Sequence, residues 1–193
     1  MKTKLLAIVS AVALGVGGIT GCSTTTTAAR GSDPVAKRHS IDSSVDSSQS
    51  RLYAQDPASR EMISKARAPL VFPSIVTAGF VVGGSYGEGA LRVAGQTARY
   101  YKTAAGSVGL LAGAESKAMY ILFMTDEALA KFRASNGWTV GADASVAMMR
   151  TGANASVDSA TVAQQAVIGY VLVKGGLMAN LSLEGTKVSP LEL

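Results

Sequence analysis

The sequence predicts an α+β fold in which a mainly antiparallel β barrel or sandwich of glycine-rich strands is flanked by two or three helices. Three observations support this fold class. Apolar and polar residues alternate with a period of two over much of the chain after Pro69. Glycine is enriched, with 21 glycines in 193 residues, and lies in or between apolar runs. Helix caps and helical spacing occur before Pro69 and again after Asp126.

The N-terminus has the pattern of an export signal. Lys2 and Lys4 precede an uncharged run of 15 residues from Leu5 to Ile19. A helix needs about 20 apolar residues to cross a bilayer, and a shorter run behind a basic start is typical of a cleaved signal. We therefore expect residues 1–21 to be a signal peptide.

The residues that end this run, Ile19-Thr20-Gly21-Cys22, resemble the lipobox of bacterial lipoproteins. The resemblance implies a diacylglyceryl thioether on Cys22, cleavage before that residue and acylation of the new amine. Two or three acyl chains make a lasting membrane anchor. Ser23 stands where many inner-membrane lipoproteins carry Asp, which favours the outer membrane with the folded part facing the periplasm. The alternative is an ordinary secretory signal with a spare thiol.

Composition limits what the mature chain can do. Removal of the signal leaves 172 residues, enough for one domain with its own core, and lowers the formal net charge from +5 to +3. A positive charge this weak and dispersed does not favour nucleic acid as a partner, although it suits an anionic lipid surface. Because Cys22 is the only cysteine, no intramolecular disulfide can form.

Residues 22–49 are rich in Ser, Thr and charge, which predicts a flexible linker between the acylated cysteine and a domain over residues 50–193. The only histidine, His39, lies in this segment, where a solvated role is far more common than a catalytic one. Helical signals begin near Val45.

A second helix is predicted after Asp56-Pro57, which supply an N-cap and a proline at the first helical position. Lys65 and Arg67 lie near its C-terminal end, where the helix dipole favours cations. Pro69 ends it. A third helix follows Asp126, which we expect to be its N-cap, and covers the sequence EALAKFRAS.

Strands are predicted from period-two alternation or from short apolar runs. The run MYILFM is apolar on both faces and is expected to be a central strand. The predicted strands cover residues 70–72, 75–83, 89–94, 99–103, 108–114, 119–124, 138–148, 167–174 and 177–185.

Motifs for catalysis and nucleotide binding are weak. The glycine-rich sequence VVGGSYGEGALR lacks the Gly-Lys-Ser/Thr end of a phosphate loop and places Glu88 where an anion would lie. Glu88, Glu115, Asp143 and Glu184 could form a hydrolytic pair, but no spacing shows that any two of them meet. With one His and one Cys, both outside the predicted domain, we expect no catalytic triad, no metal site and no cofactor.

Five sequence blocks between about Leu52 and Gly185 resemble successive blocks of the SYLF domain family, also called the Ysc84-type actin-binding family. They are KARAPLVFPSIVTAGFVVGGSYGEGAL, SVGLLAGAES, LFMTDEALAKF, GADASVA and KGGLMANLSLEG. The resemblance implies lipid binding, since eukaryotic members bind phosphoinositide-bearing membranes through a helix and basic residues. Some fungal members bind actin, which a bacterial periplasm lacks.

The resemblance also assigns candidate site residues. Lys65 and Arg67 match basic positions before the family's VFPS block, Lys174 matches the basic residue before its paired glycines, and Arg60 and Arg92 are weaker matches. With Phe72 exposed beside them, Arg60, Lys65 and Arg67 would bind a headgroup while the ring enters the acyl region. The alternative is that Phe72 belongs to the core and the cations are a solvated helix end.

The sequence therefore predicts a membrane-anchored lipoprotein whose SYLF domain binds phospholipid non-covalently, through anionic or phosphoinositide-like headgroups and without catalysis. The alternative is an outer-membrane structural or protein-interaction module without specific lipid binding. A hydrolase built on the four acids is a distant third.

Overall fold

The computed structural model describes residues 33–79, 82–108, 113–143, 146–148, 165–173, 176–177 and 185–193. Residues 32–193 form one compact unit, separate from residues 1–31. Both hydrophobic clusters of the described part consist of residues of this unit. No helix in these described ranges is long and apolar enough to cross a membrane.

One sheet contains all nine described strands. Its strands are β1 (Ala68–Gly79), β2 (Val82–Val93), β3 (Gln96–Val108), β4 (Gly113–Phe123), β5 (Trp138–Thr139), β6 (Ala147–Met148), β7 (Val167–Val173), β8 (Gly176–Leu177) and β9 (Lys187–Pro190). Their order is β5-β9-β3-β2-β1-β4-β7-β6, with β8 pairing with β7. All described pairings are antiparallel except that of β6 with β7.

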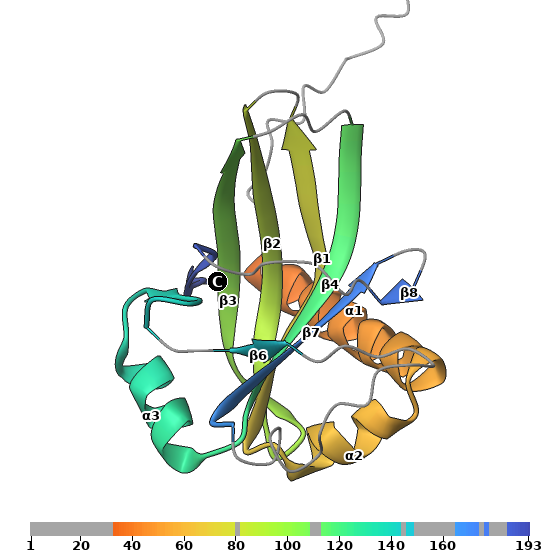
Figure 1. Ribbon diagram of the computed structural model, residues 1–193, viewed down its shortest axis with the longest axis vertical. Helices are drawn as coiled ribbons and strands as arrows, with labels where there is room; N and C mark the ends of the chain where they lie inside the picture. The colour runs from red at the N-terminus through yellow and green to blue at the C-terminus, as the bar shows by residue number, and fades with distance from the viewer. Residues whose placement is uncertain are drawn as a thin grey trace, which may run out of the picture. The chain divides into compact units, whose positions relative to one another are not determined.

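The predicted α+β class with a mainly antiparallel sheet is confirmed. The closed barrel is wrong, because the described sheet ends at β5 on one side and β6 on the other, and these strands do not pair. The long strands β1 to β4 instead form a curled, open sheet (Figure 1).

Helix α1 (Pro34–Gln55) begins well before the predicted helical signal near Val45. Asp33 caps it, since its Oδ1 accepts a hydrogen bond of 3.0 Å from the N–H of Val35. The flexible linker expected over residues 22–49 is therefore wrong for residues 34–49. The physical reason is a narrow apolar stripe, Ile41, Val45 and Leu52, which is buried against the sheet.

Helices α2 (Ala58–Lys65) and α3 (Asp126–Ala134) confirm the two other predicted helices. The predicted caps differ in detail. Thr125, rather than Asp126, caps α3 by accepting a 3.2 Å hydrogen bond from the N–H of Ala128. Helix α2 has no side-chain cap, and Pro57 occupies its N-cap position.

Hairpin β1–β2 is longer than the predicted strands, because the glycine-rich sequence between residues 83 and 89 is paired strand and not loop. A Cβ atom at Gly89 would lie 2.1 Å from the carbonyl oxygen of Val71. Glycine is required here because the backbone of β1 comes too close for any side chain.

The predicted strand over residues 138–148 is interrupted. Gly141 has φ of +89°, and Asp143 Oδ2 accepts a 2.5 Å hydrogen bond from the N–H of Thr139. These features make a turn, which leaves β5 and β6 as separate short strands. The predicted strand over residues 177–185 lies mostly outside the described residues.

The sheet buries one hydrophobic cluster on each face. The cluster on one face includes residues of helices α1 and α2, and the cluster on the other face includes residues of helix α3 and of the sheet's own strands β5 and β9. In Figure 1, strands β1 to β4 extend past α1 toward the top of the view, whereas α2 and α3 lie near the bottom. The far ends of these strands therefore have no helix over them among the described elements.

Candidate lipid-binding site

The predicted basic residues on α2 are exposed but already have partners. The guanidinium carbon of Arg60 lies 4.5 Å from the ring centre of Tyr53. The Nζ atom of Lys65 lies 2.6 Å from Glu61 Oε1, and this contact lowers the pKa of Glu61. Exposed pairs of this kind contribute little to stability, so either cation can exchange its partner for a phosphate.

Arg67 and Arg92 line one cleft of about 260 Å³ beside α2. The Nε atom of Arg67 lies 3.5 Å from Asp126 Oδ2. Arg92 is only 15% exposed and contacts two carboxylates of α1, at 2.8 Å from Asp46 and 3.6 Å from Asp42. Arg92 therefore holds α1 on the sheet, and an anion at this site would compete with these carboxylates.

The expected insertion of Phe72 into lipid is wrong. Its side chain is 0% exposed and belongs to the core cluster on the α3 face of the sheet. The alternative reading of Phe72 as a core residue is thus confirmed. Before the irregularity at Pro73, β1 alternates between the two faces, with Leu70 and Phe72 in one cluster and Val71 in the other. Cys22 and Lys174 lie outside the described residues.

Two of the four candidate acids lie on opposite faces of the sheet. Glu88 pairs with Ser74, and Glu115 pairs with Thr77, three positions further along β1. An odd spacing along a strand places side chains on opposite faces, so these two carboxylates cannot flank one glycosidic bond.

The two other candidate acids are Asp143 and Glu184. Asp143 caps the turn after β5, and Glu184 lies outside the described residues. The described ranges contain no group of three or more His, Cys, Asp or Glu residues that could hold a metal ion.

Sequence reasoning missed an exposed apolar face at the far ends of β1, β2 and β3. Val76, Val82 and Tyr86 are 48%, 72% and 50% exposed, and only one other large apolar residue in the described ranges is as open to solvent. Val76 pairs with Tyr86, and Tyr86 pairs with Ala104, so their side chains share one face. We call Val76, Ala78, Val82, Tyr86 and Ala104 the distal apolar face.

Charge is absent from the strand ends that carry the distal apolar face. No charged residue occurs in residues 76–86 or 103–114, and charges return at Glu88, Lys102 and Glu115. On the opposite face, the corresponding positions carry small or hydroxyl side chains, such as Thr77 and Ser85. This alternation is visible in the sequence, but sequence alone does not show that the apolar side lacks a cover.

Residues 104–192 match the Ysc84 family model, described as Las17-binding protein actin regulator. This match supports the resemblance to the SYLF domain. None of the curated proteins matches the chain. The matched part begins within β3 and extends through β4, α3 and the C-terminal strands.

The Ysc84 match leaves the candidate basic site untested. Arg60, Lys65, Arg67, Phe72 and Arg92 all precede residue 104, so their roles follow only from the likeness of sequence blocks outside the matched part. The distal apolar face likewise consists mainly of residues before the Ysc84 match, and only Ala104 falls within it.

Proposed function

We propose that this protein is a lipid-anchored bacterial lipoprotein whose Ysc84-type (SYLF) domain binds phospholipid non-covalently, without catalysis. In this proposal Cys22 carries the acyl anchor and the domain faces the periplasm from the outer membrane. The single observation that carries the proposal is the distal apolar face, an exposed and uncharged surface. An apolar surface of this kind marks a contact with a membrane or a partner.

The start of α1 lies beside the distal apolar face. Lys37 in its first turns lies 2.5 Å from Glu88 of β2, and a cleft there is lined by Lys37, Ile41, Val76 and Tyr86. A chain from Cys22 to Pro34 spans at most about 40 Å. An acylated Cys22 would therefore hold this part of the domain within reach of the bilayer that it is anchored in.

The energy of such a contact is modest. Full burial of a side chain such as Val or Phe contributes about 1.5–3 kcal/mol, so the exposed parts of Val76, Val82 and Tyr86 supply a few kcal/mol at most. That is too little for lasting attachment alone. It is enough to orient a domain that the anchor already holds at high local concentration.

Cations supply a second contact in the proposal. Arg60, Lys65 and Arg67 lie next to the start of β1, whereas Val76 and Ala78 lie near its end, so about 30 Å of strand separates the two surfaces. If the distal apolar face contacts a bilayer, the three cations contact the same bilayer only when the strands lie parallel to the membrane surface. The two contacts can therefore be tested separately.

The first prediction concerns Val82. Residues 32–193 are expected to float with vesicles of phosphatidylglycerol and phosphatidylcholine, and Val82→Asp should bind about tenfold more weakly, because the carboxylate must be desolvated. Ala130→Asp, which adds the same charge at an exposed position of α3, is the matched control and should bind like the parent. A triple Arg60/Lys65/Arg67→Ala variant measures the basic contact.

Two results would contradict the proposal. If Val82→Asp binds as well as Ala130→Asp, the distal apolar face is not the lipid contact. If the parent does not bind these vesicles, the distal apolar face is better explained as a contact with a protein partner. The protein-interaction module then becomes the better proposal.

A further inference from the structure

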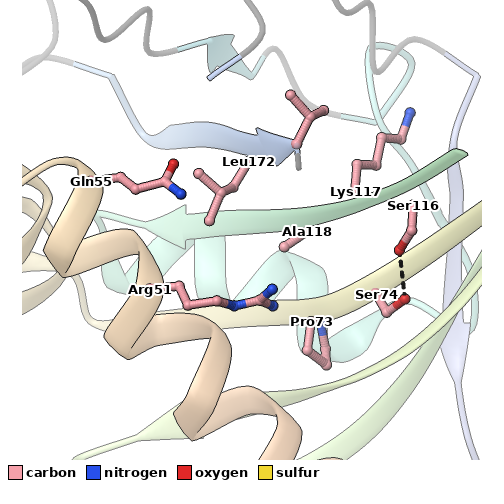
Figure 2. A pocket seen from close by; sticks show the side chains of 9 residues that line it. Arg51, Gln55, Pro73, Ser74, Ser116, Lys117, Ala118 and Leu172 are labelled. Carbon is pink, nitrogen blue, oxygen red and sulfur yellow. Dashed lines mark hydrogen bonds between the residues drawn. The ribbon is translucent and has the colours of Figure 1, made fainter. Parts of the chain in front are cut away.

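A third cleft, of about 260 Å³, lies between the C-terminal half of α1 and the sheet, where β1, β4 and β7 lie side by side (Figure 2). Its polar lining comes from Arg51 and Gln55 of α1, Ser74 of β1 and Ser116 of β4, and Leu172 contributes an apolar wall. No Asp or Glu is among the lining residues.

The cleft exists because β1 is irregular at Pro73. The register of β1 shifts between Val71 and Ser74 against β2, and between Phe72 and Ile75 against β4. Proline has no N–H to donate to the ladder, so within a central strand it is confined to such a bulge. Beyond the bulge, the hydroxyl of Ser74 lies 2.9 Å from that of Ser116.

Among the described residues, no carboxylate pairs with the donors in this cleft. Figure 2 shows the guanidinium of Arg51 extending from α1 toward Pro73 and the serine pair. Within the ranges that the structure describes, Arg51 makes no ion pair. Arg67 and Arg92, in the cleft beside α2, each make one or more. One serine hydroxyl donates to the other, which leaves one O–H free to donate to a ligand.

Lys117 borders the cleft without adding a donor to it. It lies between Ser116 and Ala118 on β4, so its side chain leaves the strand on the other face, and Figure 2 shows its ammonium directed away from Arg51. Burial lowers the pKa of Lys117.

We infer that the Arg51 cleft binds a phosphate oxyanion, either the headgroup phosphate of a phospholipid or a free phosphate ester. A planar guanidinium pairs with two phosphate oxygens, and the serine hydroxyl and the Gln55 amide supply further donors. The volume suits a small anionic group better than a whole drug-sized ligand.

The lipid source of this phosphate rests on the proposed function. Ser74 and Val76 are two residues apart on β1, so the cleft opens on the same face of the sheet as the distal apolar face. A lipid with its phosphate at Arg51 would thus have exposed apolar side chains beside it for its acyl chains.

Arg51→Gln tests the inference in residues 32–193. Amide chemical shifts of Ser74 and Ser116 are followed on addition of inorganic phosphate and of glycerol 3-phosphate, and vesicle flotation is measured with the same phosphatidylglycerol mixture and with phosphatidylcholine alone. We expect Arg51→Gln to weaken phosphate binding and anionic vesicle binding about tenfold. Arg133→Gln, an equal charge change at an exposed position on α3, should alter neither.

The outcomes separate the two sources and the two proposals. Loss of the phosphate response with unchanged vesicle binding would support the cleft with a free phosphate ester as its ligand. Equal phosphate and vesicle binding by Arg51→Gln and Arg133→Gln would overturn the inference. A parent that ignores all vesicles but responds to phosphate through Arg51 would refute the proposed function and retain the cleft.

Discussion

Gly87 and Gly89 show what the glycine-rich strands do at the scale of single residues. A Cβ atom at Gly87 would lie 2.8 Å from the Ile75 side chain, and one at Gly89 would lie 2.8 Å from the ring of Phe72. These glycines let β2 pack closely on β1 at its bulge. They serve backbone packing, which gives a physical reason why this glycine-rich sequence departs from a phosphate loop.

Tyr170 gives the stability of the protein a dependence on alkaline pH. Burial raises its pKa to about 12, with a smaller contribution from Asp56. Between pH 10 and 12 the unfolded chain loses this proton while the folded chain keeps it, so the free energy of unfolding falls as pH rises. Below pH 10 both states are protonated and the full stability is present.

The second prediction compares the parent with Tyr170→Phe. The free-energy difference between the two in urea unfolding should shift by on the order of 2 kcal/mol in favour of the variant between pH 9 and pH 12. Comparison with the variant cancels the titration of the other tyrosines and the lysines. A difference that stays constant over this range would show that the Tyr170 phenol titrates normally in the folded protein.

At the scale of elements, α1 is the helix that composition alone did not predict, because its first part was assigned to a flexible linker. Half of its 22 residues are Ser, Asp, Lys or Arg, and only one side is buried. Ser48 adds to that side, since its hydroxyl lies 2.5 Å from the hydroxyl of Tyr120 in the core. A buried polar group with a partner strengthens packing without raising hydrophobicity, so a composition rule assigns this segment to solvent.

The third prediction tests whether α1 is structural. Val45 is fully buried and Val35, on the same helix, is 66% exposed. Val45→Ala should lower the free energy of unfolding by about 2 kcal/mol because it leaves a cavity, whereas Val35→Ala should change it by less than about 0.5 kcal/mol. Urea denaturation measures both. Equal, small effects would mean that residues 34–49 behave as the linker predicted from composition.

Elements with local signals could be predicted from the sequence, and elements set by tertiary contacts could not. Helix α3 followed from the capping residues near Asp126, and the central strand β4 from an unbroken apolar run. The prediction of one continuous strand through Gly141 was wrong. A turn with a left-handed glycine at this position is compatible with the same alternation of apolar and polar residues. At the candidate site, the cations were found by resemblance, but Arg51 carries no local signal, since the bulge at Pro73 creates its cleft.

At the scale of the whole molecule, two attachments of unequal strength would act on one domain. Covalent acyl chains contribute about 0.8 kcal/mol for each buried methylene, so an acylated Cys22 dominates membrane retention. In the proposed function, the distal apolar face would add only a few kcal/mol and, because it lies on one side of the sheet, would act by orienting the domain. Removing the acyl anchor should therefore change membrane retention, whereas removing the distal apolar face should change only the reversible binding of the domain to vesicles.

The last prediction uses the full chain expressed in a bacterial host, with Cys22→Ser and Val82→Asp introduced singly and together. The parent and Val82→Asp should both enter the detergent phase on partitioning, because the acyl chains suffice for retention. Cys22→Ser should enter the aqueous phase yet still bind anionic vesicles reversibly. The double variant should also enter the aqueous phase and should bind these vesicles about tenfold more weakly. Mass spectrometry of the mature parent should show added acyl mass on Cys22. A mature parent with a free thiol and an aqueous partition would remove the anchor from the proposal, and the distal apolar face would then have to hold the membrane without the local concentration that a tether provides.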